Sequence, residues 1–272
     1  MLDRKALPSN YQNVIELNEI LIALNKNQFK LFYQPIIDLS TAEVSNLEAL
    51  IRWEHPKKGL IAPCDFLPQL EAASLLFSVQ EWVIETVIND LEKMDKICPK
   101  LTYSINLSAS DGDFDRILSP LAIFLEKYDL DPARIIFELT EASIINHHRN
   151  NYSILEDLRE LGFQLAIDDF GSGYASSDCL NSLKIDYVKL DRKFITDINH
   201  NILNQTVVSA TLAIARRLNI KVIAEGVERS EEYLWLKGEG CNFGQGFYFA
   251  HPMPLEQLCQ SREFFDHQKK VQ

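Results

Sequence analysis

The chain has 272 residues, of which 46% are hydrophobic, and it carries a formal net charge of −12 at pH 7. This length is sufficient for one large domain with a full hydrophobic core, so we expect a single domain over residues 1–272. The acidic balance and the lack of a dense Lys/Arg stripe exclude a face that neutralises nucleic-acid phosphates, so no DNA or RNA polymer binding is expected.

The cysteines are odd in number and scattered, with no C-x-x-C pair. They are Cys64, Cys98, Cys179, Cys241 and Cys259. This pattern is typical of reduced thiols in a cytosol-like compartment rather than of disulfides or a zinc site. No apolar run in the sequence has the character of a signal peptide or the length of a bilayer span. We therefore expect a cytoplasmic location, or the cytoplasmic domain of a membrane-tethered protein if the chain is excised from a longer one.

A recurring pattern of short apolar runs and helical stretches organises the chain. The stretch 10–28 predicts an opening helix, and helical patterns follow at 77–94, 153–162, 203–219 and, at the end, 254–268. The apolar runs lie at 31–37, 47–53, 101–108, 134–141, 163–170, 186–192, 221–228 and 243–250. Eight such runs with intervening helices favour an α/β fold, the (β/α)₈ or TIM barrel.

The first connection departs from this pattern. Only residues 38–46 separate the first two runs, whereas a parallel crossover needs about a dozen residues or more. We therefore predict a modified TIM barrel whose first strand runs antiparallel to the second.

Polar residues interrupt nearly every apolar run close to its end. They are Glu48, Asn106, Glu138, Asp168, Asp169, Lys189, Glu225 and Gln245. In a TIM barrel the C-terminal ends of the strands carry the active site. One such acid alone is more often part of a structural salt bridge. The same arrangement on seven strands instead predicts an active site.

The ligand types at these positions indicate a hard cation. Carboxylates and an amide, without histidine or cysteine, suit Mg²⁺ or Mn²⁺ and argue against zinc. The five acids contribute −5 and Lys189 reduces the sum to −4, which two divalent ions would cancel. Metal pairs of this kind hydrolyse phosphate esters by activating water. Asp168 and Asp169, adjacent at a strand end and followed by Gly171 and Gly173, are placed to address different ions.

Two cationic side chains allow alternatives. Strand alternation places Glu48, Leu50 and Arg52 on one face. The Arg52 guanidinium would bind a phosphate there, and the alternative is a surface salt bridge. Lys189 either orients the attacking water and stabilises transition-state charge, or forms a Schiff base as in barrel aldolases. The surrounding carboxylates would keep the pKa of Lys189 high, which favours the first interpretation.

The sequence resembles an EAL domain, the bacterial phosphodiesterase family that linearises cyclic di-GMP. The resemblance is carried by "YQPIIDL", "EALIRWEHP", "INLS", "ELTE", "IDDFGSGY", "VKLDR", "IAEGVE" and "QGF" in the family's order and spacing. It extends from about Phe29 to Pro254, which we take as the core of one EAL-type domain. It implies a modified TIM barrel with an antiparallel first strand, in agreement with the connection length.

The resemblance also implies a role for each matching residue. The first metal ion would be held by Glu48, Asn106, Glu138 and Asp168. Asp169 would serve chiefly the second ion. Glu225 matches a general base or a member of the metal-water network, and Lys189 matches the lysine that positions the attacking water.

The remaining matching residues would contact the substrate or support a loop. The substrate-contacting positions are Gln34, Leu50 and Arg52, with Gln245 as a supporting glutamine. Glu141 matches the glutamate that steadies the loop "DDFGSGY", which shapes the second metal site and a homodimer contact in the family. Within that loop, Ser172 and Ala175 replace the usual Thr and Ser.

We therefore expect hydrolysis of cyclic di-GMP to the linear 5′-phosphorylated dinucleotide, by in-line attack of metal-activated water. The alternative is a weakly active or silent EAL domain that acts as a cyclic di-GMP receptor and signals through a protein partner. A third reading, an aldolase using Lys189, would act without metal. The chain shows no cyclase or sensor sequence, so a regulatory domain or protein would be separate.

Overall fold

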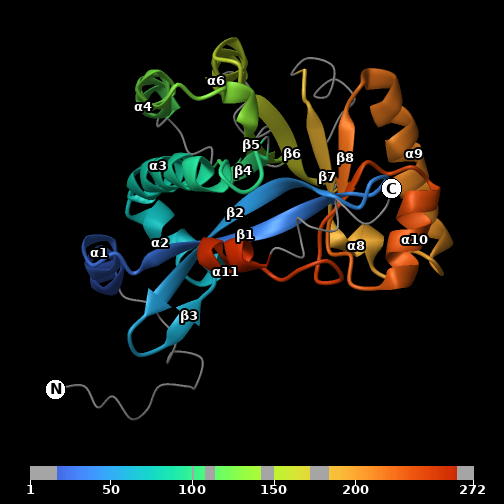
Figure 1. Ribbon diagram of the computed structural model, residues 1–272, viewed down its shortest axis with the longest axis horizontal. Helices are drawn as coiled ribbons and strands as arrows, with labels where there is room; N and C mark the ends of the chain where they lie inside the picture. Colours follow the sequence, from blue (N-terminus) through green and yellow to red (C-terminus); the bar gives the residue numbers. More distant parts are fainter. Residues whose placement is uncertain (1–16, 100, 108–113, 142–149, 172–183, 262–272) are drawn as a thin grey trace. The chain divides into compact units, whose positions relative to one another are not determined.

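The computed structural model describes residues 17–99, 101–107, 114–141, 150–171 and 184–261. The strands are β1 (Phe29–Asp38), β2 (Val44–His55), β3 (Gly59–Ile61), β4 (Thr102–Asn106), β5 (Ile135–Thr140), β6 (Gln164–Phe170), β7 (Tyr187–Leu190), β8 (Lys221–Ala224), β9 (Phe243–Gly244) and β10 (Met253–Pro254) (Figure 1). The helices are α1 (Leu17–Asn25), α2 (Leu67–Ala72), α3 (Leu76–Met94), α4 (Phe114–Tyr128), α6 (Asn150–Glu160), α8 (Arg192–Ile195), α9 (Ile202–Leu218), α10 (Ser230–Gly238) and α11 (Leu255–Gln260), with short 3₁₀ turns η2 (Pro63–Asp65) and η3 (Pro132–Arg134).

The chain divides into two compact units, residues 1–30 with 51–79 and residues 31–50 with 80–272. An aromatic cluster forms the core of the first unit. The ring centroid of Phe29 lies 5.7 Å from that of Trp53 and 5.3 Å from that of Phe66. The Trp53 indole, fully buried, donates a hydrogen bond of 3.0 Å to the side chain of Gln28. These contacts give the first unit its own packed interior.

The second unit contains the closed eight-stranded barrel that the sequence predicts. The strands β2, β4, β5, β6, β7, β8 and β9 are parallel neighbours in that order. β1 pairs with β9 in the antiparallel sense and also pairs with β2, which closes the barrel. The first strand therefore runs antiparallel to the second, as the short connection predicts, and the modified TIM barrel is confirmed.

The eighth predicted run is a strand only at its start. β9 covers Phe243–Gly244, whereas the prediction extended the strand to residue 250. Beyond Gln245 the backbone turns, because Gly246 adopts φ 156° and its carbonyl accepts hydrogen bonds from the amides of Phe249 and Ala250. The predicted run was therefore too long, since a local turn ends the strand. The sequence pattern also missed β3 and β10, which pair at the edges of the sheet.

An apolar layer fills the barrel. It consists of Ile36, Ile136, Ala166, Tyr187, Ile223 and Phe243, each at most 6% exposed. Each of these residues comes from a different strand, and alternate residues of a strand face the same side. The residue two positions further along each strand therefore also points into the barrel interior.

The predicted helices at 77–94, 153–162 and 203–219 correspond to α3, α6 and α9 within a few residues. Of the opening and closing helices, the structure describes α1 and α11, which are shorter than predicted, since residues 26–28, 254 and 261 are not helical. Residues 10–16 and 262–268 lie outside the described residues. In the described part of the chain, no helix combines the length and the apolar character needed to cross a membrane.

Candidate active site

The predicted polar residues gather at one end of the barrel. Glu138, Lys189 and Glu225 each lie two residues beyond a member of the apolar layer on the same strand or just past its end. Because β4 to β9 are parallel, their C-terminal ends meet at one rim. β1 runs the other way, so its earlier residue Gln34 reaches that rim. The strand order thus brings residues that are far apart in the sequence together at one site.

Lys189 lies at the centre of this site. Its ammonium is 2.7 Å from Glu138 Oε2, 2.7 Å from Glu225 Oε1, 3.4 Å from Glu48 Oε1 and 3.7 Å from Asp168 Oδ1. The lysine is 1% exposed. Burial tends to lower the pKa of Lys189, but the four carboxylates outweigh it and hold the pKa well above its usual value. A permanently protonated lysine is a poor Schiff-base nucleophile, which disfavours aldolase chemistry.

Glu48 is a buried carboxylate whose two oxygens both accept hydrogen bonds. Asn106 Nδ2 donates to its Oε1 over 2.9 Å, and Gln245 Nε2 donates to its Oε2 over 2.5 Å. Burial tends to raise the pKa of Glu48, yet Lys189 and these two amides together lower it. Gln245 Nε2 also lies 3.1 Å from Gln34 Oε1, and Gln34 donates to the Ala250 carbonyl. Four of the predicted residues therefore form one network.

Two other carboxylates have the opposite tendency. Burial, with repulsion from Glu48 and Asp168, raises the pKa of Glu138 to about 8 despite the attraction of Lys189. Burial and the same acids raise the pKa of Glu225 to about 7. One lysine is therefore insufficient to compensate the acids that surround it.

Asp168, Asp169 and Glu225 each offer a carboxylate oxygen within 4.8 Å of the others. Asp169 adopts φ 55°, a left-handed conformation, and its amide donates to Asp168 Oδ1 over 2.9 Å. Burial and the neighbouring acids Asp168 and Asp191 raise the pKa of Asp169. Such a strained, repulsive pairing of acids is typical of a cation site.

The residues present fit a divalent metal ion. Glu138 Oε1 is buried and has no hydrogen-bond partner among the described residues, so the best-buried acid keeps one oxygen free to coordinate. The donor set consists of carboxylates and an amide oxygen, which are the ligands of hard cations. An acidic cluster suited to a metal ion is therefore present.

The other predicted residues are less closely tied to this cluster. Glu141 is buried, and its Oε2 accepts a hydrogen bond of 3.0 Å from the Gly171 amide, directly after the two aspartates. Leu50 is half-buried on β2. Arg52 belongs to the first unit, where its Nη1 donates to the Ile51 carbonyl. The loop positions Ser172 and Ala175, and the dimer contact expected of that loop, lie outside the described residues.

Sequence reasoning missed the contacts that fix the loop after β8. Gly226 adopts φ 69° and lies against the Arg192 side chain, which leaves no room for a Cβ atom. Arg192 also pairs with Glu228 at 2.8 Å. The glycine after Glu225 in "AEGVE" was the available signal, because a positive φ is easiest for glycine.

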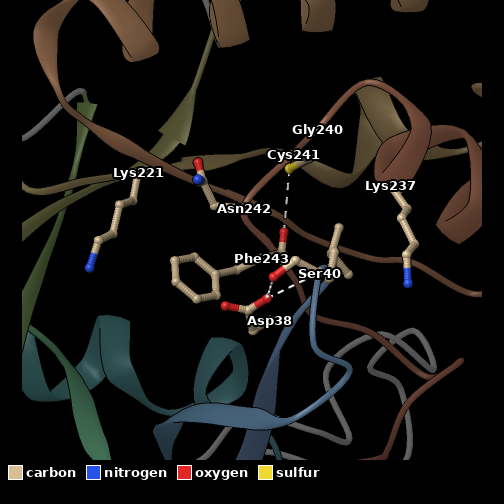
Figure 2. Close-up of a pocket in the computed structure, with 9 residues that line it drawn as sticks. Asp38, Ser40, Lys221, Lys237, Gly240, Cys241, Asn242 and Phe243 are labelled. Atoms are coloured by element: carbon tan, nitrogen blue, oxygen red, sulfur yellow. Dashed lines mark hydrogen bonds between the residues drawn. The ribbon is translucent and has the colours of Figure 1, made fainter. Parts of the chain in front are cut away.

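A hollow with a volume of about 340 Å³ lies elsewhere in the second unit (Figure 2). It is lined by Lys221 and Phe243, at the starts of β8 and β9, and by Asp38 at the end of β1. The acid cluster is at the opposite ends of these strands. Asp38 is also engaged by its own turn, since its Oδ1 accepts from the amide and hydroxyl of Ser40. This hollow is therefore separate from the candidate active site.

The chain belongs to the EAL domain family, whose model matches residues 17–252. It is 35% identical over 258 residues to the bifunctional diguanylate cyclase/cyclic di-GMP phosphodiesterase MucR of Pseudomonas aeruginosa, covering 94% of this chain and 38% of MucR. It is 38% identical over 232 residues to the cyclic di-GMP phosphodiesterase PdeR of Escherichia coli, covering 85% of this chain and 35% of PdeR. The chain thus spans little more than a third of the length of these relatives.

A solved structure, the PaMucR phosphodiesterase in complex with c-di-GMP, matches with a TM-score of 0.83 and 35% identity over 89% of this chain and 98% of that chain. The EAL domain of FimX from Pseudomonas aeruginosa, bound to c-di-GMP, matches with a TM-score of 0.76 and 25% identity, covering 87% of this chain and 96% of that chain. These similarities agree with the barrel fold.

Proposed function

We propose that this chain is a metal-dependent phosphodiesterase that hydrolyses cyclic di-GMP to the linear 5′-phosphorylated dinucleotide. The observation that carries the proposal is the cluster of carboxylates around buried Lys189 at the C-terminal rim of an EAL-domain barrel. The names of MucR and PdeR support the same substrate. When bound, Mg²⁺ or Mn²⁺ supplies water activation and charge neutralisation for in-line displacement at phosphorus.

Two ions per site are proposed. Glu48, Asn106, Glu138 and Asp168 would hold the first ion, and Asp169 would chiefly hold the second. The charge of the cluster supports this number, because one lysine leaves several of the acids without a counter-ion. The side-chain amide of Asn106 now donates to Glu48, so its oxygen remains available as a ligand.

The chain's own residues would manage the proton of the attacking water. Glu225 lies 2.7 Å from Lys189, and its carboxylate is within 4.8 Å of those of Asp168 and Asp169, so it is suited to accept that proton. Lys189 contacts both Glu138 and Glu225 at 2.7 Å and would orient the water between them. Glu141 would hold the backbone after Asp169 through the Gly171 amide.

Substrate positioning would fall to Gln34, Leu50, Arg52 and Gln245. The support for Gln34 and Gln245 is their hydrogen bond to each other, next to Glu48. A guanidinium suits the phosphodiester because it forms paired hydrogen bonds with phosphate oxygens.

We further propose that residues 1–272 act as one EAL-type domain, that the domain forms a homodimer, and that it works in the cytoplasm under a separate regulatory or sensor domain or protein. The family match from residue 17 to 252 includes segments of both compact units, which supports a single domain. The greater length of MucR and PdeR supports additional domains in such proteins.

The decisive experiment measures hydrolysis of cyclic di-GMP in Mg²⁺, in Mn²⁺ and in EDTA, with Glu48→Ala and a matched control. Glu54→Ala removes an exposed acid from the same strand. We expect metal-dependent formation of the linear dinucleotide, lowered at least about 100-fold by Glu48→Ala and unchanged by Glu54→Ala. Normal turnover in Glu48→Ala would refute the metal assignment. Tight nucleotide binding by the unmodified chain without product would instead indicate a receptor.

A further inference from the structure

Glu232, on the first turn of α10, is a buried acid outside the candidate active site. Only 1% of its surface is exposed. We propose that Glu232 is a positioning residue that holds the loop carrying Glu225 and the backbone of Gln245 in the arrangement needed for catalysis. This inference rests on the proposed function.

Both carboxylate oxygens of Glu232 are used. Oε2 accepts hydrogen bonds from the backbone amides of Glu228 and Arg229, at 2.9 and 3.1 Å. Oε1 accepts from the Asp197 amide at 3.1 Å and from Arg229 Nε and Nη2 at 3.2 and 2.9 Å. Arg229 Nη2 also contacts Asp197 Oδ1. One side chain therefore joins the segment after β8 to the segment after α8.

Other contacts also fix the segment between Glu225 and Glu228, among them the ion pair of Arg192 with Glu228 at 2.8 Å and the hydrogen bond of 3.0 Å that the Tyr248 amide donates to the Val227 carbonyl. The Glu225 amide donates to the Leu190 carbonyl at 3.1 Å, and the Val227 amide donates to the Gln245 carbonyl at 3.0 Å. Glu232 holds the far end of the same segment through Glu228. A shift at Glu228 would therefore be passed to the Glu225 carboxylate at one end and to Gln245 through Val227.

Close packing leaves this segment little freedom. A Cβ atom on Gly246 would lie 2.1 Å from the Val227 carbonyl oxygen, so the backbones after β8 and β9 are in direct contact. Gln245, one residue earlier, donates to Glu48 at 2.5 Å. Displacement of the Val227 backbone would therefore disturb two of the proposed functional side chains, Glu225 and Gln245.

The charge of Glu232 is well compensated. Burial tends to raise its pKa, but the amides of Glu228, Asp197 and Arg229, with the Arg229 guanidinium, together lower it. The spacing of Arg229 and Glu232 is that of a capping box, in which the third helical residue caps the N-terminus. If its role were purely structural, Glu232 would only cap the N-terminus of α10.

The test compares Glu232→Ala, Glu232→Gln and Glu231→Ala, the last of which removes an exposed acid from the same helical turn. For each protein we would measure the thermal midpoint, kcat and KM for cyclic di-GMP, and Mn²⁺ affinity by electron paramagnetic resonance of free Mn²⁺. Kinetics are measured well below each midpoint. Glu232→Ala should lower kcat or Mn²⁺ affinity about 10- to 100-fold, and displacement of Gln245 should also raise KM. Glu232→Gln, which keeps one acceptor oxygen, should recover part of the loss, and Glu231→Ala should match the unmodified chain.

The two hypotheses fail in different ways. If Glu232→Ala lowers only the thermal midpoint and leaves kcat and Mn²⁺ affinity unchanged, Glu232 merely caps α10 and the inference is wrong. If the unmodified chain produces no linear dinucleotide, the proposed function fails, and Mn²⁺ affinity alone then decides whether Glu232 positions the acidic cluster. Equal effects of Glu232→Ala and Glu231→Ala would also overturn the inference.

Discussion

Two layers inside the barrel differ in chemistry although the same strands build both. Ile136, Tyr187 and Ile223 belong to the apolar layer, and two residues further along each strand direction lie Glu138, Lys189 and Glu225. Two residues of a strand span only about 7 Å. Within that distance the interior changes from packed hydrocarbon to a cluster of acids around one lysine.

The difference shows how stability and chemistry are separated in this fold. Full burial of a large apolar side chain contributes roughly 1.5 to 3 kcal/mol, so the apolar layer stabilises the barrel. The polar layer instead concentrates negative charge in a buried place, which raises the pKa of Glu138 to about 8. The apolar layer therefore stabilises an arrangement of acids that would repel one another.

The largest effect should come from removing the central cation. Lys189→Met leaves Glu48, Glu138 and Glu225 without their counter-ion, and we expect a loss of about 3 to 5 kcal/mol in the free energy of unfolding, measured by urea denaturation in EDTA. Saturating Mn²⁺ should restore part of it. The control Lys193→Met removes an exposed lysine and should cost less than about 1 kcal/mol. Equal losses in the two variants would contradict the central role of Lys189.

Next in size is a cavity in the apolar layer. Ile136→Ala, at a fully buried position, should lower the free energy of unfolding by roughly 2 to 5 kcal/mol. Turnover measured well below the unfolding transition should stay within about 3-fold of normal, because all the acids proposed to bind the metal ions are still present. Ile123→Ala, at a position 61% exposed, should change stability by less than about 0.5 kcal/mol. A selective loss of turnover without loss of stability in Ile136→Ala would show that the layers are not separable.

Glu138→Gln should give the smallest change in stability. It should also separate stability from function most clearly, because it should stabilise the protein but abolish metal binding. It replaces an acid whose pKa of about 8 makes ionisation unfavourable in the folded protein, so near pH 7 the metal-free protein should gain about 1 kcal/mol in unfolding free energy. Stabilisation by Mn²⁺, about 2.7 kcal/mol at 100 times the dissociation constant for the unmodified chain, should disappear. Glu126→Gln, an exposed substitution on α4, serves as control and should retain the full Mn²⁺ effect. A metal-free Glu138→Gln protein less stable than the unmodified chain would refute this account of the charge cluster.

Much of the fold could be read from local pattern. The apolar runs at β1, β2 and β4 to β8 are long enough for periodicity to identify them, and the short first connection fixes the direction of β1. β3, β9 and β10 are only two or three residues long, so they carry too little pattern to be recognised or bounded. Their existence depends on pairing with distant strands.

The sequence by itself determined which side chains meet at the rim, because alternation and parallel strand order require Glu138, Lys189 and Glu225 to share one end of the barrel. Only the tertiary structure decided how they interact. The 2.5 Å contact of Gln245 with Glu48 joins residues 197 positions apart, and Glu232 reaches the Asp197 amide across 35 positions. Such distances, and the pKa values that follow from burial, arise from the packing of elements that are far apart along the chain.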